Sequence, residues 1–242
     1  GAVMGGGLEL ALSCHYRTMA DNVAAIALPE VFLGLFPGWG GTQLLPNLIG
    51  PDAAVTVIVE NALNQNKMLK PAQAAELGIT DELLPSADYL EQSLLWLAKV
   101  VRGEATPARR EIDRGDEWDA AMGRAKAVVA GKTKGASPGA EKALELLELA
   151  RTADRDAGYA AETQALAELL MSDPLRSGLY SFDLVNKRAK KPAGAPDKSL
   201  ARQVGKVGIV GAGLMASQLA LLFVRRLKVP VMPGLIRWRA MY

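Results

Sequence analysis

The 242-residue sequence contains only one cysteine, Cys14, and one histidine, His15. A single cysteine excludes an intrachain disulfide and fits a reducing environment, so we expect a cytoplasmic protein. Histidines, cysteines and carboxylates nowhere have the spacing of a metal site, which predicts that no metal is bound. The apolar stretch 219–224 is far too short to span a bilayer. The N-terminus also lacks the basic segment and long apolar run that are typical of a signal peptide.

Acidic residues are missing from the C-terminal part, because Asp197 is the last of the 26 in the sequence. Eight of the 28 basic residues follow Asp197, so the first 197 residues carry 20 basic and 26 acidic side chains, a net charge of −6. A basic tail can bind nucleic acid or another anion. We favour the alternative that this tail is an incomplete domain whose acidic residues are missing, and we expect no nucleic-acid partner.

Half of the residues are hydrophobic and 22% are charged, which predicts a folded core rather than a disordered chain. We divide the sequence into domains at 1–101, 102–202 and 203–242. In the first domain we expect helices at 8–14, 42–48, 71–77 and 89–101, with strands at 24–28 and around Ile79. Thr42 is the predicted cap of the second helix, which ends at Gly50.

The middle domain, 102–202, is predicted to be a helical linker region. Helical spacing appears at 118–130, and Ser137-Pro138 is a favourable start for another helix. Apolar stripes continue through 166–170 and 182–185, followed by a short linker at 192–196. The last domain opens with an apolar strand at 206–210, a glycine turn and a helix to Leu227.

The first candidate site combines the glycine triplet 5–7 with Glu9 and Glu30. Glycines at a helix start let a ligand approach the backbone closely and direct free amide groups at it. Such amides can stabilise an enolate oxygen, and two carboxylates around one water can move its protons. The alternative is that Glu9 only complements the helix dipole and that Glu30 is a solvated turn residue.

Three other side chains have simpler interpretations. We interpret His15 as a polar residue at a helix end, because nothing in the sequence pairs with it. Trp39 could line an acyl pocket or pack in the core. Cys14 is most simply a buried core residue.

The second candidate site is a strand followed by Gly211-Ala212-Gly213 and a helix that contains Ala216. This order is typical of the phosphate turn of a dinucleotide-binding domain, in which the helix N-terminus holds the pyrophosphate. The alternative is a glycine turn in another α/β unit. The acidic residue expected roughly 20 positions later is absent, although Arg237 and Arg239 could bind a 2′-phosphate instead.

Residues 1–14 (GAVMGGGLELALSC), 27–46 (ALPEVFLGLFPGWGGTQLLP) and 74–81 (AAELGITD) resemble the crotonase (enoyl-CoA hydratase/isomerase) superfamily. The resemblance implies an α/β fold, the C-terminal part of a ClpP/crotonase-type domain, with a CoA thioester as substrate. It implies that Glu9 and Glu30 are the catalytic acids and bases of hydration. It also implies oxyanion and substrate-binding roles for the residues Gly5, Gly6, Pro37 and Gly38.

The order of the parts resembles the multifunctional α-subunit of fatty-acid oxidation complexes, which joins a hydratase to an NAD-dependent 3-hydroxyacyl-CoA dehydrogenase. The resemblance extends to about residue 231 and implies that the C-terminal part is the first βα unit of a Rossmann domain. It also implies an acyl-CoA substrate, self-association and a thiolase β-subunit as partner. The implied NAD-binding residues are Gly211, Gly213, Leu214, Met215 and Ala216.

The resemblance implies that the chain is a fragment. The dehydrogenase's catalytic histidine and glutamate would follow Tyr242, and the half of the crotonase domain with the other oxyanion amide would precede Gly1. We therefore expect weak or no hydratase activity and no dehydrogenase activity. Two alternatives are a hydratase or isomerase with one activity and an unrelated tail, and a non-catalytic CoA-binding remnant.

Overall fold

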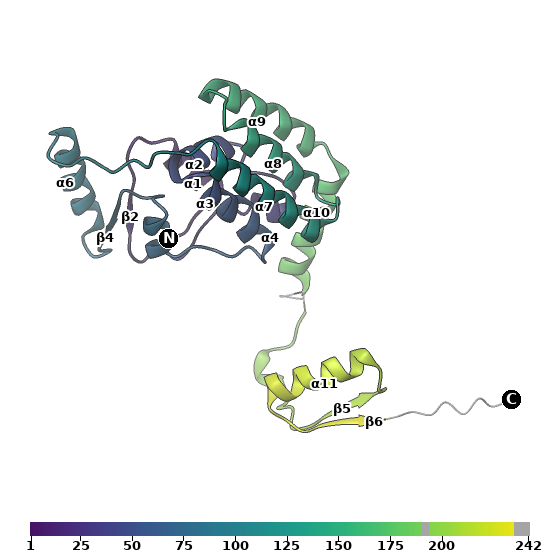
Figure 1. Cartoon of the computed structure of the whole chain (residues 1–242). Helices are drawn as coiled ribbons and strands as arrows, with labels where there is room; N and C mark the ends of the chain where they lie inside the picture. Colours follow the sequence, from purple (N-terminus) through teal and green to yellow (C-terminus); the bar gives the residue numbers. More distant parts are fainter. Residues whose placement is uncertain (190–193, 235–242) are drawn as a thin grey trace. The chain divides into compact units, whose positions relative to one another are not determined.

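We describe the fold from a computed structural model, which defines residues 1–189 and 194–234. The chain forms two compact units, Gly1–Lys190 and Lys191–Tyr242 (Figure 1). The three predicted domains therefore do not coincide with these units, and their boundaries stay a prediction. Arg237, Arg239 and part of the predicted linker 192–196 lie outside the described residues. Within the described residues, no helix combines the length and apolar character needed to cross a membrane.

Two pairs of short parallel strands organise the first part of the larger unit. β1 (Val3–Met4) pairs with β3 (Ile26–Ala27), and β2 (Thr18–Ala20) pairs with β4 (Glu82–Leu84). The crossover that parallel pairing requires contains α1 (Gly6–Leu12). Because parallel strands end at the same edge, Gly5 after β1 and Glu30 after β3 are brought to one place. Glu30 itself begins η1 (Glu30–Leu33), a 3₁₀ turn.

Helices make up most of the rest of the larger unit (Figure 1). The helices before residue 102 are α2 (Gly41–Ile49), α3 (Pro51–Val55), α4 (Asn61–Leu63), α5 (Pro71–Glu76) and α6 (Tyr89–Val101), with a π-helical turn, η2 (Thr56–Glu60), between α3 and α4. The later ones are α7 (Asp116–Thr133), α8 (Pro138–Leu149), α9 (Arg155–Leu170) and α10 (Asp173–Asp183), and α10 continues into a π-helical turn, η3 (Leu184–Ala189). The helical character predicted for residues 102–202 is confirmed by α7, α8, α9 and α10.

The core lies where these helices meet. α7 packs against α3 and α8, and α8 packs in turn against α2 and α9. The largest fully buried apolar side chains come from α2, α7 and α8 and from segments beside them, and they include Trp118, Phe36, Leu8, Ile26, Leu45, Ile58 and Leu147. Each contributes about 1.5–3 kcal/mol through removal of apolar surface from water. α6 differs, since all its residues are at least partly exposed and it contacts β2 and β4 at the far end of the unit (Figure 1).

Three local predictions are wrong. Thr42 does not cap α2, because Gly40 is the N-cap residue and the Thr42 hydroxyl donates to Glu162. Ile79 is buried but lies in no strand, and the strand of this region is β4. Cys14 is exposed, because it follows the last turn of α1 rather than facing the core.

The smaller unit is a β-α-β arrangement. After η4 (Lys198–Leu200) come β5 (Val207–Val210), α11 (Leu214–Leu227) and β6 (Val231–Gly234). β5 and β6 are parallel, with Val207 opposite Val231. The predicted βα unit is therefore followed by a second strand. All residues of α11 are at least partly exposed, so this unit buries little apolar surface and should contribute little stability by itself.

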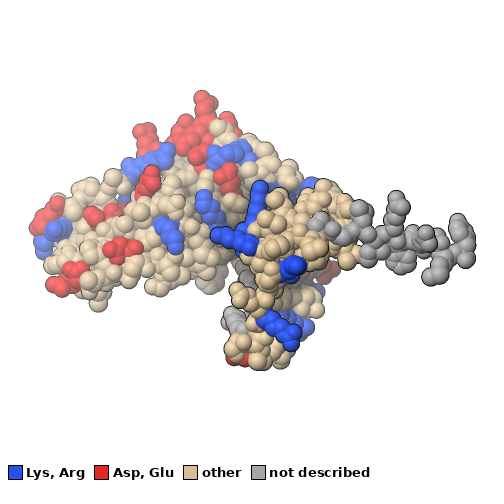
Figure 2. All heavy atoms as spheres, turned by 90° about the horizontal axis from the view of Figure 1, so that it is seen from below, with Lys and Arg blue, Asp and Glu red and all other residues tan. Residues whose placement is uncertain are grey.

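The surface charges are mixed on the face drawn in Figure 2, where acidic and basic side chains are separated by larger areas of other residues. Most of the ion pairs of the larger unit join partly exposed side chains, as in Arg124 with Asp52 and Glu60. Exposed pairs of this kind contribute only about 0–1 kcal/mol each. The core rather than the surface charge therefore accounts for the stability of the larger unit.

We predict that Gly139→Ala destabilises the larger unit by about 1–3 kcal/mol. A Cβ at Gly139 would lie 2.2 Å from the carbonyl oxygen of Gly34, which ends the turn that carries Glu30. The matched control is Gly123→Ala in α7, where a Cβ would meet open space among the described residues. This control should gain about 0.5–1 kcal/mol. Urea unfolding of both variants checks the pair, and equal effects would contradict the packing of α8 on Gly34.

Candidate functional site

The glycine turn before α1 forms the floor of the candidate site. Gly5 has φ +55°, and its amide donates to the carbonyl oxygen of Ala27 in β3 at 3.0 Å. The amides of Leu8 and Glu9 donate back to the Gly5 carbonyl at 2.8 and 3.1 Å. The first amides of an α-helix have no partner within the helix, so the Gly6 amide is available to a ligand.

Glu30 lies directly against this turn. A Cβ on Gly5 would be 2.6 Å from Oε1 of Glu30, so only glycine fits beside the carboxyl group. The other oxygen, Oε2, is buried and has no hydrogen-bond partner among the described residues. Burial, together with the charge of Glu9, raises the pKa of Glu30 to about 7. The alternative of a solvated Glu30 is therefore wrong for its carboxyl group.

Glu9 reaches from α1 to the loop that precedes α2. Only 3% of the residue is exposed, and its Oε1 accepts from the amides of Trp39 at 2.7 Å and Gly41 at 3.0 Å. Burial raises the pKa of Glu9, and these two hydrogen bonds oppose the rise. Glu9 does lie in the first turn of α1, as helix-dipole stabilisation requires, but its carboxylate is bound to another segment.

Residues 37–42, which we call the glycine loop, bring the remaining predicted residues to the same place. Pro37 is buried, and a Cβ on Gly41 would lie 2.5 Å from its Cβ. Gly38 packs against Phe36 and α9. The Trp39 ring lies over Gly6, where a Cβ would be 2.9 Å from the ring, yet the residue is 71% exposed. Trp39 is therefore a surface residue beside the site rather than part of the core.

Sequence reasoning missed one residue of this cluster, Glu162 in α9. Glu162 is 1% exposed, and its carboxylate accepts from the amides of Gly40 at 2.5 Å and Thr42 at 3.0 Å. The Thr42 hydroxyl donates to it at 2.5 Å. Burial is the main cause that raises the pKa of Glu162 to about 7. The available signal was a glutamate within the buried stripe of α9, which otherwise holds only small and apolar residues, namely Gly158, Ala165 and Leu169.

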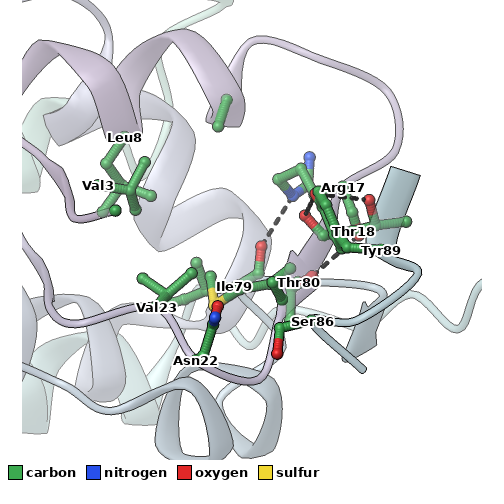
Figure 3. Close-up of a pocket in the computed structure, with 14 residues that line it drawn as sticks. Val3, Leu8, Arg17, Thr18, Asn22, Val23, Ile79, Thr80, Ser86 and Tyr89 are labelled. Atoms are coloured by element: carbon green, nitrogen blue, oxygen red, sulfur yellow. Dashed lines mark hydrogen bonds between the residues drawn. The ribbon is translucent and has the colours of Figure 1, made fainter. Parts of the chain in front are cut away.

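Two of the cavities near these residues bear on the choice of a substrate site. One of about 370 Å³ is lined by Val3, Leu8 and Ile79, with Thr18 hydrogen-bonded to Tyr89 at 3.0 Å (Figure 3). Among the described residues that line it, no carboxylate appears. The other, about 630 Å³, has a largely apolar lining that includes Met4, next to Gly5, and Phe32, two residues after Glu30.

The second predicted site lies in the smaller unit. Gly211 has φ +112° and Gly213 is the N-cap residue of α11. A Cβ at either glycine would meet open space among the described residues. Leu214 and Met215 are exposed at the start of α11, and Ala216 follows them in its first turn. The turn is open enough for a phosphate to reach the helix N-terminus.

Similar solved structures are enoyl-CoA hydratases. One from Geobacillus kaustophilus HTA426 is 26% identical with a TM-score of 0.38, and the match covers 75% of this chain and 55% of that one. One from Mycobacterium avium subsp. paratuberculosis K-10 is 17% identical with a TM-score of 0.49, covering 76% and 60%. A carnitinyl-CoA hydratase from Mycobacterium avium is 19% identical with a TM-score of 0.47, covering 75% and 56%. The match therefore spans little more than half the length of these proteins.

A family model described as enoyl-CoA hydratase/isomerase matches residues 1–111. The matched range contains the glycine turn, Glu9, Glu30 and the whole glycine loop. It ends before α7, so α8 and α9 lie outside it. Residues 1–111 are therefore a domain of the enoyl-CoA hydratase/isomerase family.

Proposed function

We propose that Glu9 and Glu30 add water across the double bond of a 2-enoyl-CoA thioester to give a 3-hydroxyacyl-CoA. The observation that carries this proposal is that two buried carboxyl groups from different elements pack around one glycine turn. Gly5, the N-cap residue of α1, contacts Glu30, and Glu9 lies in the first turn of α1. The membership of residues 1–111 in the hydratase/isomerase family supports the choice of substrate class.

The protonation states suggest a role for each carboxyl group. Glu9 accepts two amide hydrogen bonds, which favour its ionised form, so we assign it as the base that takes a proton from water. Glu30, with a pKa of about 7 and an unpartnered oxygen, is assigned as the acid that protonates Cα. Water's oxygen bonds to Cβ while the π electrons move toward the thioester, and the Gly6 amide stabilises the enolate oxygen. Transfer of a proton from Glu9 back to Glu30 then restores both groups.

The apolar cavity beside Met4 and Phe32 fits the acyl chain of such a substrate. Phe32 forms an edge-to-face contact with Phe182 at a centroid distance of 6.2 Å, and both line the cavity. A hydratase or isomerase with a single activity fits these observations as well as a bifunctional enzyme does, because both would use Glu9 and Glu30.

The test is hydration of crotonyl-CoA, which is measured as the loss of enoyl-thioester absorbance. We expect slow hydration above the rate without protein, and Glu9→Gln and Glu30→Gln should each lower kcat by about 10²–10⁴-fold. Glu76→Gln, an exposed residue of α5, should leave kcat unchanged. Unchanged kcat in both active-site variants, or no hydration at all, would favour the non-catalytic interpretation.

The raised pKa of Glu30 also predicts how stability depends on pH. The ordinary pKa of this group is 4.5, and in the folded protein it is about 7. Between these values the folded protein holds a proton that the unfolded chain has released, so the free energy of unfolding falls as pH rises. The loss from this one group is of order 3 kcal/mol. Glu30→Gln should therefore be more stable than the unsubstituted protein at pH 8 and similar to it at pH 4.5.

Urea unfolding at both pH values, monitored by far-ultraviolet circular dichroism, measures this difference in the free energy of unfolding. Glu76→Gln serves as the exposed control and should follow the unsubstituted protein at each pH. Parallel stability curves for Glu30→Gln and the unsubstituted protein would show that the buried acid does not titrate as expected.

We also propose that residues 207–234 form the first β-α-β unit of a dinucleotide-binding domain, which would couple hydration to NAD-dependent oxidation. The specific support is the parallel pairing of β5 with β6 and the glycine turn at the start of α11. Gly211 adopts a positive φ that favours glycine. Amides at the start of a helix after such a turn can bind a pyrophosphate.

Saturation-transfer NMR with NAD tests this second proposal. We expect a weak signal from the chain that Gly211→Val abolishes, because a β-branched residue is strained at φ +112°. Gly205→Val is the matched control, since Gly205 precedes β5 and a Cβ there would meet open space among the described residues. A signal that survives Gly211→Val, or no signal from the unsubstituted chain, would contradict the proposal.

A further inference from the structure

Two carboxylates bind four consecutive amides of the glycine loop. The amides of Trp39 and Gly41 donate to Glu9, and those of Gly40 and Thr42 donate to Glu162. The loop therefore lies between α1 and α9, and its successive amide groups alternate between the two helices. The positive φ of Gly40, +96°, allows the chain to make this reversal.

The contact between α9 and the loop is close on both sides of Glu162. A Cβ on Gly40 would lie 2.7 Å from the ring of Tyr159, and one on Gly38 would lie 3.1 Å from Leu166. Gly158 lies so near Gln43 that a Cβ would be 2.4 Å from its side chain. Gln43 itself donates to the carbonyl oxygen of Leu146 in α8 at 3.1 Å. α9 thus holds the loop, whereas α8 holds Gln43, the residue that follows it. Both helices lie outside the segment that the family model matches.

A buried carboxylate is costly, and three donors satisfy this one. An apolar residue at position 162 would leave the Gly40 and Thr42 amides without these bonds, at a cost of about 1–3 kcal/mol for each buried donor. A role confined to stability would be met by any group that binds these two amides. Because the amides alternate, rotation of the Gly40 or Thr42 peptide plane also turns the adjacent amides of Trp39 and Gly41. Loss of the bonds to Glu162 would therefore also disturb the bonds to Glu9.

We infer that Glu162 is a positioning residue for Glu9. By fixing the amides of Gly40 and Thr42, it holds those of Trp39 and Gly41 in the orientation that binds Glu9 at 2.7 and 3.0 Å. This inference rests on the proposed role of Glu9 as the base of hydration. Its first consequence, the order of the Trp39 and Gly41 amides, can be measured in the absence of substrate.

The experiment compares Glu162→Gln with Glu168→Gln, an exposed glutamate on the same helix. The glutamine has the same shape but presents an amide NH₂ group, a hydrogen-bond donor, where one of the carboxylate oxygens accepted a hydrogen bond. We expect hydrogen exchange at Trp39 and Gly41 to accelerate by roughly 10-fold or more, as their bonds to Glu9 open more often. For crotonyl-CoA, kcat should fall by about 10–100-fold with little change in KM, because the base is misplaced while the substrate still binds. Glu168→Gln should change neither quantity.

A milder pair keeps the inference testable if Glu162→Gln does not fold. Thr42→Val removes the hydroxyl that donates to Glu162, and Thr42→Ser keeps it. We expect faster exchange at Trp39 and Gly41 and a lower kcat with valine, and recovery of both with serine.

Faster exchange confined to Gly40 and Thr42, with Trp39, Gly41 and kcat unchanged, would overturn the inference and leave Glu162 a stabilising role only. If the unsubstituted protein shows no hydration, the proposed function fails. Exchange at Trp39 and Gly41 would still decide whether Glu162 orders the amides that bind Glu9.

Discussion

The glycine loop depends on hydrogen bonds from its own backbone to buried carboxylates on two helices. Amide donors are the groups that best satisfy a carboxylate removed from water, and each donor would itself be costly to bury unpaired. The loop amides and the carboxylates of Glu9 and Glu162 therefore satisfy each other's hydrogen bonds. Glu30 is placed independently, by the parallel pairing of β1 with β3 that brings it against Gly5. The candidate site is thus assembled from one sheet edge and one pair of helices.

Much of the site could be predicted from the sequence, because its signals are local. A glycine triplet before a helix and a carboxylate after a short apolar strand each lie within a few residues of the element that places them. Parallel strand ends then bring Gly5, which precedes the helix of Glu9, against Glu30. Helices with strong periodicity, such as 89–101, agree with α6 to the residue.

The rest could not be predicted, because it depends on contacts distant in sequence. Glu162 lies 122 residues after Gly40, and nothing near it shows that a loop needs its carboxylate. Thr42 has the composition of a cap residue, yet its hydroxyl bonds to Glu162, a partner that local capping rules cannot reveal.

The contacts of the glycine loop extend beyond the segment that the family model matches. The match to the hydratase/isomerase family model ends at residue 111, whereas Glu162, which accepts hydrogen bonds from the loop, lies in α9. A segment that keeps all the hydrogen bonds of the loop therefore has to include α9, because Glu162 accepts from the amides of Gly40 and Thr42.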